Sequence, residues 1–158
     1  MKRIPLTQGQ FALVDDEDYD FLMKWKWYAL KGKNTFYAVR DIQIDKKKKT
    51  IWLHRVIMNI PEGMFTDHKD HDGCNNQRYN LRNCTKSQNN RNRKKVEGCS
   101  SKFKGSCWNK RAKSWFAYIK VGPKLKSLGY FKNEIEAALA YNIAAKELFK
   151  EFAELNEV

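Results

Sequence analysis

The chain of 158 residues contains four cysteines, and none of them stands in a Cys-x-x-Cys pair. The ligand spacing of a structural zinc site is therefore missing. The sequence also has no signal peptide and no apolar run long enough to span a membrane, so we expect a cytoplasmic protein with free thiols and no membrane contact. Its hydrophobic content of 42% excludes a disordered chain.

Acidic residues are absent from one long stretch of the chain. Residues 101–132 carry nine lysines and arginines and no acidic residue, whereas residues 133–158 carry two basic and six acidic side chains. Residues 1–45 are balanced, with seven side chains of each sign. The formal net charge of +13 is therefore unevenly distributed, and the stretch without acids indicates a surface that binds a polyanion.

Residues 64–93 hold an acid, a base and two amides in order: Asp67, His68, Asn80 and Asn89. A hydrolytic metal site needs oxygen ligands for a hard divalent cation, an imidazole that takes a proton from water, and a group that orients the imidazole. Each residue alone is commonplace, but the four together indicate catalysis. An EF-hand calcium loop is excluded, because Tyr79 stands where that loop needs a bidentate glutamate.

The pattern around these residues predicts a strand, a loop, a second strand and a helix. Residues 64–68 and 81–84 fit the two strands, joined by a loop that closes at Asp72-Gly73. Thr85 fits a helix N-cap, because Gln88 follows in the capping-box position. Asn89 would then lie on the first turns of the helix, where it can face the end of the first strand.

This stretch resembles the HNH endonucleases, in particular the phage-type and intron-encoded ones. Asn80 follows His68 by twelve residues and Asn89 follows Asn80 by nine, with Leu-His-Arg-Val-Ile-Met-Asn upstream at residues 53–59. The resemblance implies a ββα-metal fold in which Asp67 and Asn89 bind Mg²⁺ or Mn²⁺. It further implies that His68 is the general base and that Asn80 orients the His68 ring through its side-chain oxygen. Asn90 is the alternative to Asn89.

The residues before this stretch predict short β-hairpins and two short helices. We expect strands at residues 4–6, 11–14, 25–30, 36–44 and 50–53, and helices at residues 15–23 and 53–59. The lysines at residues 46–49 are expected in a turn. Trp25 and Trp27 fit core positions better than base-stacking platforms. For His54, the sequence allows two roles: a position near the predicted site or a purely structural one.

A second unit is predicted after residue 101. Residues 103–108, 114–121 and 124–131 fit three antiparallel strands, and Asn133 fits the N-cap of a helix over residues 134–149, with Glu136 in the capping-box position. The alanines of this helix imply that it approaches the sheet closely. One face of the sheet is then covered, and we expect the free face to carry most of the basic side chains.

This unit resembles the DNA-binding domain of the plant APETALA/ethylene-response-factor type. The matching pieces are Phe103-Lys104-Gly105, Trp115-x-Ala117-x-Ile119-Lys120, Leu128-Gly129-Tyr130-Phe131 and the alanine-rich helix from Glu136 to Ala145. The resemblance implies a sheet that lies in the major groove of DNA. The departures from the plant pattern are Cys107, Asn109, Tyr118 and Ser127. The plant recognition sequence therefore does not carry over, because bidentate arginine contacts are lost.

Six residues of this unit are candidates for DNA contact. Lys104 and Lys120 fall where the plant domains place contacting basic residues, and Trp108 has basic neighbours, whereas Trp115 is as well explained by a core position. The complete set is Lys104, Trp108, Lys110, Arg111, Lys120 and Lys126.

Together these patterns predict an α+β protein in two domains. Residues 1–95 form a nuclease domain with a ββα-metal core at about residues 64–93, residues 96–101 form a linker, and residues 102–156 form a DNA-binding domain of three strands and one helix. The resemblance to the HNH endonucleases implies metal-dependent hydrolysis of phosphodiester bonds in duplex DNA by a nicking or homing endonuclease, with 5′-phosphate and 3′-hydroxyl ends on the products.

Two alternatives remain open at this point. The first is a DNA-binding regulator with an inactive HNH unit, and the second is a nuclease directed at RNA. By family habit, the expected setting is a mobile phage element in the cytoplasm of an infected or bacterial host cell. We expect a monomer or weak dimer without a further protein partner.

Overall fold

The computed structural model describes residues 1–95, 98 and 100–158. These residues form two compact units, Met1–Lys86 and Ser87–Val158. Both units combine small antiparallel sheets with a few helices, so the predicted α+β class is confirmed. The predicted linker at residues 96–101 includes residues 96, 97 and 99, which lie outside the described residues, and the predicted domain limits stay a prediction.

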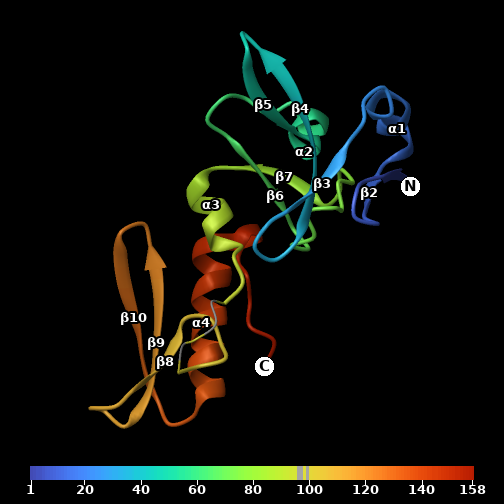
Figure 1. Cartoon of the computed structure of the whole chain (residues 1–158). Coiled ribbons are helices and arrows are strands. Elements are labelled where there is room, and N and C mark those ends of the chain that lie inside the picture. The colour runs from blue at the N-terminus through green and yellow to red at the C-terminus, as the bar shows by residue number, and fades with distance from the viewer. Residues whose placement is uncertain (96–97, 99) are drawn as a thin grey trace. The chain divides into compact units, whose positions relative to one another are not determined.

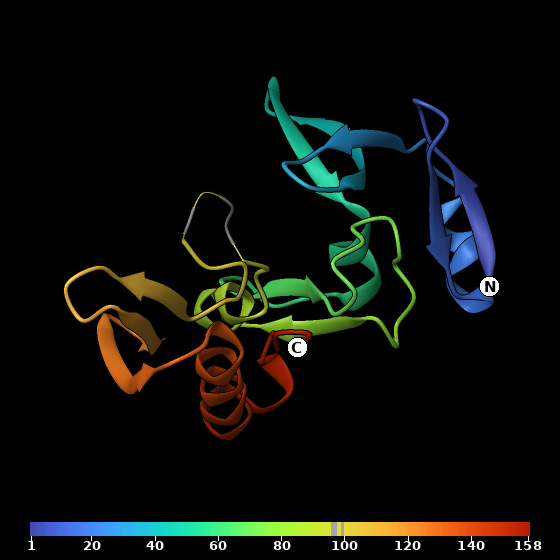
Figure 2. The same ribbon diagram turned by 90° about the horizontal axis from the view of Figure 1, so that it is seen from below.

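The first unit begins with a β-hairpin and a short helix. Strands β1 (Lys2–Pro5) and β2 (Phe11–Val14) pair antiparallel, and α1 (Asp16–Leu22) follows and lies beside β1 (Figure 2). The first turn of α1 contains only acidic side chains, which the positive end of the helix dipole favours. The hairpin and α1 then present apolar residues to the core of this unit.

The second sheet of this unit has the strand order β3-β4-β5 (Figure 1). Its strands are β3 (Tyr28–Lys31), β4 (Phe36–Ile44) and β5 (Lys47–Trp52). The predicted turn at residues 46–49 is wrong, since β5 begins at Lys47. Asp45 and Lys46 have φ values of 49° and 61°, typical of a two-residue hairpin turn, so the next lysines extend the edge strand.

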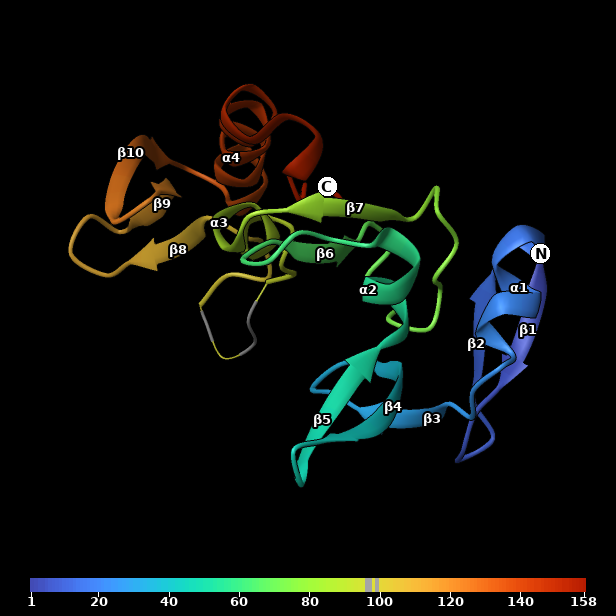
Figure 3. The same ribbon diagram turned by 90° about the horizontal axis from the view of Figure 1, so that it is seen from above.

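Helix α2 (Leu53–Met58) and strands β6 (Phe65–His68) and β7 (Leu81–Cys84) complete the first unit. β6 and β7 pair antiparallel, as predicted, and α2 contacts both of them as well as β4 and β5 (Figure 3). The core takes residues from β1, β2, α1, β4, α2 and β7 and from the segment just before β3: Ile4, Ala12, Val14, Leu22, Trp27, Ala38, Leu53, Ile57 and Leu81. Trp27 is therefore a core residue, and its Nε1 donates a hydrogen bond to the Leu22 carbonyl at 2.8 Å.

The second unit is a sheet backed by one long helix. α3 (Lys86–Arg91) belongs to it except for its first residue. β8 (Ser106–Asn109), β9 (Ser114–Val121) and β10 (Lys124–Phe131) form a sheet of order β10-β9-β8, followed by α4 (Glu134–Phe149) and the 3-10 turn η1 (Lys150–Phe152) (Figure 1). Asn133 caps α4 as predicted, because its Oδ1 accepts a hydrogen bond from the Glu136 amide at 2.8 Å.

Helix α4 packs closely against its sheet. Ala137, Ala138 and Ala145 are fully buried, as the alanine pattern predicts. Gly105, just before β8, has a φ of 74°, and a Cβ atom at this position would collide with the ring of Tyr141. Only glycine fits there, since both the backbone conformation and the space exclude a side chain.

Candidate active site

The predicted acid and base are consecutive residues at the end of β6. Asp67 is 5% exposed and His68 is 7% exposed. Their side chains leave opposite faces of the strand, because successive residues of a strand alternate. In the pairing with β7, Asp67 lies opposite Arg82 and His68 lies opposite Leu81. A two-stranded ribbon therefore fixes the backbone of both residues.

Asp67 forms an ion pair with the residue opposite it. Arg82 Nε lies 2.8 Å and Arg82 Nη2 lies 2.7 Å from Asp67 Oδ2, and both side chains are almost completely buried. A buried carboxylate is costly unless a cation accompanies it, and Arg82 supplies that cation here. Asp67 thus presents carboxylate oxygens that are held in place by its cross-strand neighbour.

The donor chemistry at Asp67 fits a hard divalent cation. In the part of the chain that the structure describes, no group of three or more His, Cys, Asp or Glu side chains could hold a metal ion. A cation here would take its other ligands from amide, water or phosphate oxygens. Mg²⁺ keeps several waters and commonly uses one or two carboxylates, whereas a structural zinc ion needs four protein ligands.

His68 lies in an aromatic surround. Its ring centroid is 5.1 Å from that of His54 and 6.0 Å from that of Tyr37, both in edge-to-face geometry. Burial lowers the pKa of His68 below its usual value, although the hydrogen bond to Asn76 and the charge of Asp70 act in the opposite direction. The imidazole is therefore neutral near pH 7, which is the form that accepts a proton.

The amide that approaches the His68 ring is Asn76. Its Oδ1 lies 3.4 Å from His68 Nε2, and its Nδ2 donates to the Cys74 carbonyl at 2.9 Å. The expectation that Asn80 orients the ring through its side-chain oxygen is not met. Asn80 Oδ1 accepts from the Asp70 amide at 3.1 Å, while Asn80 Nδ2 donates to Asp70 Oδ1 at 2.9 Å and to the Asn75 carbonyl at 2.8 Å.

Asp70 is the centre of a second polar network in the loop between β6 and β7. It accepts hydrogen bonds from the Asp72 amide at 2.9 Å and from Asn75 Nδ2 at 2.7 Å, in addition to Asn80. Burial alone would raise the pKa of Asp70, but these hydrogen bonds outweigh it and hold the pKa below its ordinary value. Asn80 therefore acts on the site by shaping the loop that carries Asn76.

The N-terminal elements hold this loop from outside. The Leu13 amide donates to the Cys74 carbonyl and the Asn76 amide donates to the Leu13 carbonyl, each at 2.8 Å. Arg78 binds Asp18 through Nε at 2.9 Å and Nη2 at 2.6 Å. Sequence reasoning missed these contacts, because they join residues about sixty positions apart.

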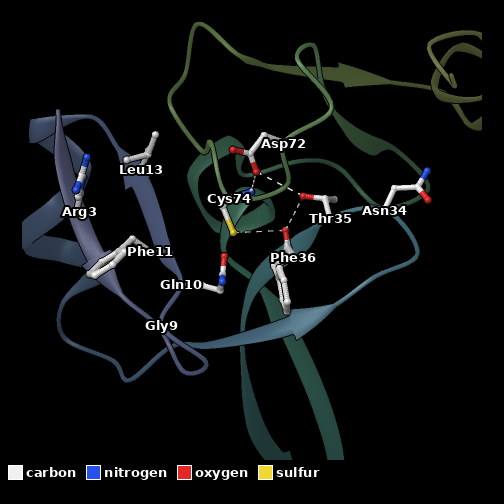
Figure 4. Close-up of a pocket in the computed structure, with 10 residues that line it drawn as sticks. All are labelled: Arg3, Gly9, Gln10, Phe11, Leu13, Asn34, Thr35, Phe36, Asp72 and Cys74. Carbon is white, nitrogen blue, oxygen red and sulfur yellow. Dashed lines mark hydrogen bonds between the residues drawn. The ribbon is translucent and has the colours of Figure 1, made fainter.

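A pocket of about 510 Å³ borders the same loop (Figure 4). Thr35 bridges its wall, since its Oγ1 accepts from the Gly73 amide at 3.0 Å and lies 3.4 Å from Asp72 Oδ1. The lining residues are Arg3, Gly9, Gln10, Phe11, Leu13, Asn34, Thr35, Phe36, Asp72 and Cys74. None of the predicted catalytic residues lines it, so this pocket is separate from the Asp67 and His68 site.

Asn89, the predicted second metal ligand, lies on α3 and is half-buried, and Asn90 is exposed. Both belong to the second unit, whereas Asp67 and His68 belong to the first. The assignment of Asn89 stays a prediction from the sequence.

Lys104, a predicted DNA contact, is engaged within the second unit. Its Nζ donates to the main-chain carbonyls of Arg91 and Arg93, each at 2.6 Å. Burial lowers the pKa of Lys104 to about 8, against a smaller opposing effect from Glu154. This geometry gives Lys104 the role of joining α3 to the start of the sheet unit.

The register of the sheet divides the other candidates between its two faces. Ala117 and Ile119 are buried toward α4, and Trp108 shares their face, because it lies opposite Trp115. The opposite face carries Lys120 together with a row of aromatic rings. Phe116 is 5.8 Å from Tyr118 and 5.0 Å from Tyr130 between ring centroids.

Within the strands, the free face thus carries an aromatic row and a single lysine, and the expectation that it carries most of the basic side chains is wrong. Lys126 lies opposite Ile119 on the neighbouring strand, so its side chain leaves the sheet on the face that α4 covers. Lys110 and Arg111 are exposed in the turn between β8 and β9. The cations of this unit thus gather at turns and strand ends more than on the free face itself.

Comparison with known proteins places this site in a family. Residues 52–91 match the family model described as HNH endonuclease, and this range contains α2, β6, β7 and α3. A protein of Acanthamoeba polyphaga mimivirus named as an uncharacterized HNH endonuclease is 31% identical over 153 residues, which cover 96% of this chain and 77% of the relative. This chain belongs to the HNH endonuclease family.

The HNH endonuclease match covers the whole predicted site. Asp67, His68, Asn80 and Asn89 all lie within residues 52–91, and the predicted nuclease activity is confirmed at the level of the family. The mimivirus relative aligns with nearly the entire chain, so it shares the second unit as well. The likeness of residues 102–156 to the plant domain stays a prediction, and no solved structure matches the chain. No helix in the described residues is long and apolar enough to cross a membrane.

Proposed function

We propose that this HNH endonuclease hydrolyses phosphodiester bonds of duplex DNA with the help of a divalent cation. The observation that carries the proposal is the pair at the end of β6, a buried His68 whose pKa is lowered by burial and a buried Asp67 that forms an ion pair with Arg82. A base that is neutral at the working pH and an adjacent anionic oxygen ligand are the two groups that metal-assisted hydrolysis requires.

His68 is the general base of this reaction. It takes a proton from a water molecule whose oxygen attacks the scissile phosphorus. The bond between phosphorus and the 3′ oxygen then breaks, and this oxygen receives a proton from solvent. The products carry a 5′-phosphate and a 3′-hydroxyl. Asn76 is a positioning residue, because its Oδ1 approaches His68 Nε2 at 3.4 Å, and Asn80 supports the same loop through Asp70.

Asp67 is the proposed ligand of Mg²⁺ or Mn²⁺, and Asn89 is the proposed second ligand on the strength of its spacing from Asn80 in the HNH pattern. When bound, the cation neutralises developing charge on the phosphate and on the leaving oxygen. Arg82 holds Asp67 through one carboxylate oxygen, at 2.7 and 2.8 Å, and so fixes the direction in which the carboxylate faces. The ββα-metal description of β6, β7 and α3 belongs to this proposal.

The second unit is proposed to hold duplex DNA through its sheet, in the manner of the plant domain. Lys110 and Arg111 at the β8–β9 turn and Lys120 on the free face are assigned to phosphates, whose contacts give affinity without sequence information. The aromatic row would meet apolar groups in the major groove, such as thymine methyls. Trp108 and Lys126 are assigned to the rim of this surface, and Lys104 to its internal support.

A supercoiled plasmid distinguishes the enzyme from the alternative of an inactive DNA-binding regulator. Protein with Mg²⁺ should convert the plasmid to the relaxed form, and EDTA should abolish the conversion. A gel shift without relaxation in Mg²⁺ or Mn²⁺ would favour the regulator. His68→Ala is the matched control for contaminating nuclease, because it removes the base and leaves the DNA-binding surface intact.

One active site cuts one strand, so a monomer should nick DNA, and cleavage of both strands requires a weak dimer or a second encounter. A nicking or homing role in a mobile phage element within the host cytoplasm is part of the proposal, and it rests on the family resemblance. Mapping the cleavage positions on phage DNA tests this part independently of the chemistry.

A further inference from the structure

His54 is a second imidazole at the His68 site, and the reaction proposed above leaves it without a role. It is the second residue of α2 and is 8% exposed. Its ring meets the His68 ring edge-to-face, with 5.1 Å between centroids and 88° between planes. The rings of Trp52 and Tyr37 lie 5.7 Å and 6.2 Å from it. His54 therefore contacts the base directly from within an aromatic cluster.

The Nδ1 atom of His54 is buried and has no hydrogen-bond partner among the described residues. Buried polar atoms are nearly always paired, because an unpaired one loses its hydration without compensation. If the ring served only to pack against Tyr37, Trp52 and His68, a phenylalanine would fill the place without this penalty. A buried nitrogen without a hydrogen-bond partner in the folded chain indicates that its partner is a group of a bound ligand.

A second unpaired polar atom lies on the strand that carries His68. Thr66 Oγ1 is buried without a partner among the described residues, and Thr66 lies two positions before His68 on β6. Side chains two positions apart on a strand share one face. Unsatisfied polar atoms thus flank His68 from both α2 and β6, the two elements that contact each other here.

We infer that His54 is a further catalytic residue, whose Nδ1–H donates a hydrogen bond to a non-bridging oxygen of the scissile phosphate. This inference rests on the proposed function, because it requires the water activated by His68 to attack that phosphate. A phosphate oxygen is an acceptor only, and a neutral imidazole has one N–H to give. A donor aimed at the oxygen on which charge develops stabilises the transition state more than the bound substrate.

Three variants distinguish the effect of the His54 ring nitrogen from the effect of the aromatic ring itself. His54→Phe keeps an aromatic ring and removes the nitrogen, whereas His54→Asn places an amide near the position of Nδ1. We expect His54→Phe to lower the rate of plasmid nicking on the order of 10- to 100-fold, the value of one hydrogen bond to a charged group. His54→Asn should recover most of this loss, and His54→Leu, which has neither ring nor nitrogen, should not. Affinity for uncleaved DNA in EDTA should stay within about two-fold, because the donor acts mainly in the transition state.

Thermal melting and a sulfur-substituted substrate complete the test. His54→Phe should melt at or above the wild-type temperature. With a phosphorothioate at a mapped cleavage position, one diastereomer should slow the wild type more than it slows His54→Phe, since sulfur accepts hydrogen bonds poorly. Wild-type nicking by His54→Phe, a lower melting temperature of this variant, failure of rescue by His54→Asn, or equal slowing by sulfur would each overturn the assignment. Absence of nicking by the wild type itself would instead refute the proposed function.

Discussion

Replacing His54 by phenylalanine should change how the stability of the first unit depends on pH. Burial, with smaller effects from His68 and Arg55, lowers the pKa of His54 to about 3, against 6.5 in an unfolded chain. Below pH 6.5 the unfolded state therefore binds a proton that the folded state does not bind. The free energy of unfolding contributed by this group is fully present above pH 6.5 and is lost progressively as the pH falls toward 3.

The size of this effect follows from the two pKa values. Between pH 7 and pH 5 the folded His54 stays neutral and the unfolded one becomes almost fully protonated, so the free energy of unfolding falls by about 2 kcal/mol. His54→Phe lacks this dependence. His68 also has a lowered pKa, but it is present in both proteins and cancels in the difference. At pH 7 the variant should be at least as stable as the wild type, because an unpaired buried nitrogen has been removed.

Urea unfolding at pH 7, 6 and 5 measures this difference. Trp108 and Trp115 lie in the second unit, so replacing both by phenylalanine leaves the fluorescence of Trp25, Trp27 and Trp52 to report the first unit alone. The wild type should lose about 2 kcal/mol more than His54→Phe across this range. Parallel curves for the two proteins would refute the reasoning, since they would mean that the folded protein protonates His54 as easily as the unfolded chain does.

Four further substitutions test separate parts of the molecule. His68→Ala should reduce plasmid nicking on the order of 10²- to 10⁴-fold with unchanged DNA affinity, and nicking near the wild-type rate would mean that another group is the base. Lys120→Ala should lower the slope of log affinity against log salt by about 0.9, measured by fluorescence anisotropy, whereas Lys104→Met should leave it unchanged because Lys104 faces main-chain carbonyls. Asn80→Ala should lower the free energy of unfolding by about 3 kcal/mol, one for each lost hydrogen bond, and an unchanged urea midpoint would contradict that value.

Local sequence signals predicted the elements that depend on local chemistry. The strands at residues 65–68 and 81–84 and the helix at residues 134–149 lie within a residue of their expected limits. A Gly-containing turn, the alternation of apolar and polar residues in a strand, and a helix-capping residue are all recognised from neighbouring positions. Predictions based on them therefore hold without knowledge of the tertiary fold. The lysines at residues 47–49 failed as a turn because a run of equal charges carries no information on backbone conformation.

Side-chain roles depended on contacts that spacing does not encode. Asn76 and Asn80 stand four residues apart in one loop, and only the folded loop decides which amide approaches His68. Lys104 belongs to a basic stretch, but its burial and its carbonyl partners come from α3. The alternation of β9 could have placed Trp108 on the face covered by α4. Its cross-strand partner Trp115 lies two positions before buried Ala117, so both point to that face, and paired residues of β8 and β9 share a face.

The loop between β6 and β7 is stabilised largely by residues outside the HNH pattern. Asp15 and Asp18 of the α1 region bind the Arg78 amide and guanidinium, and Leu13 of β2 exchanges two main-chain hydrogen bonds with the loop. The strand pair β6–β7 by itself is short, and an isolated two-stranded ribbon is at best marginally stable in water. A base must be held within a fraction of an ångström of its working position. Under the proposed function, β2 and the α1 region support the base by holding the loop that carries Asn76, and a perturbation there should reach His68 without touching it.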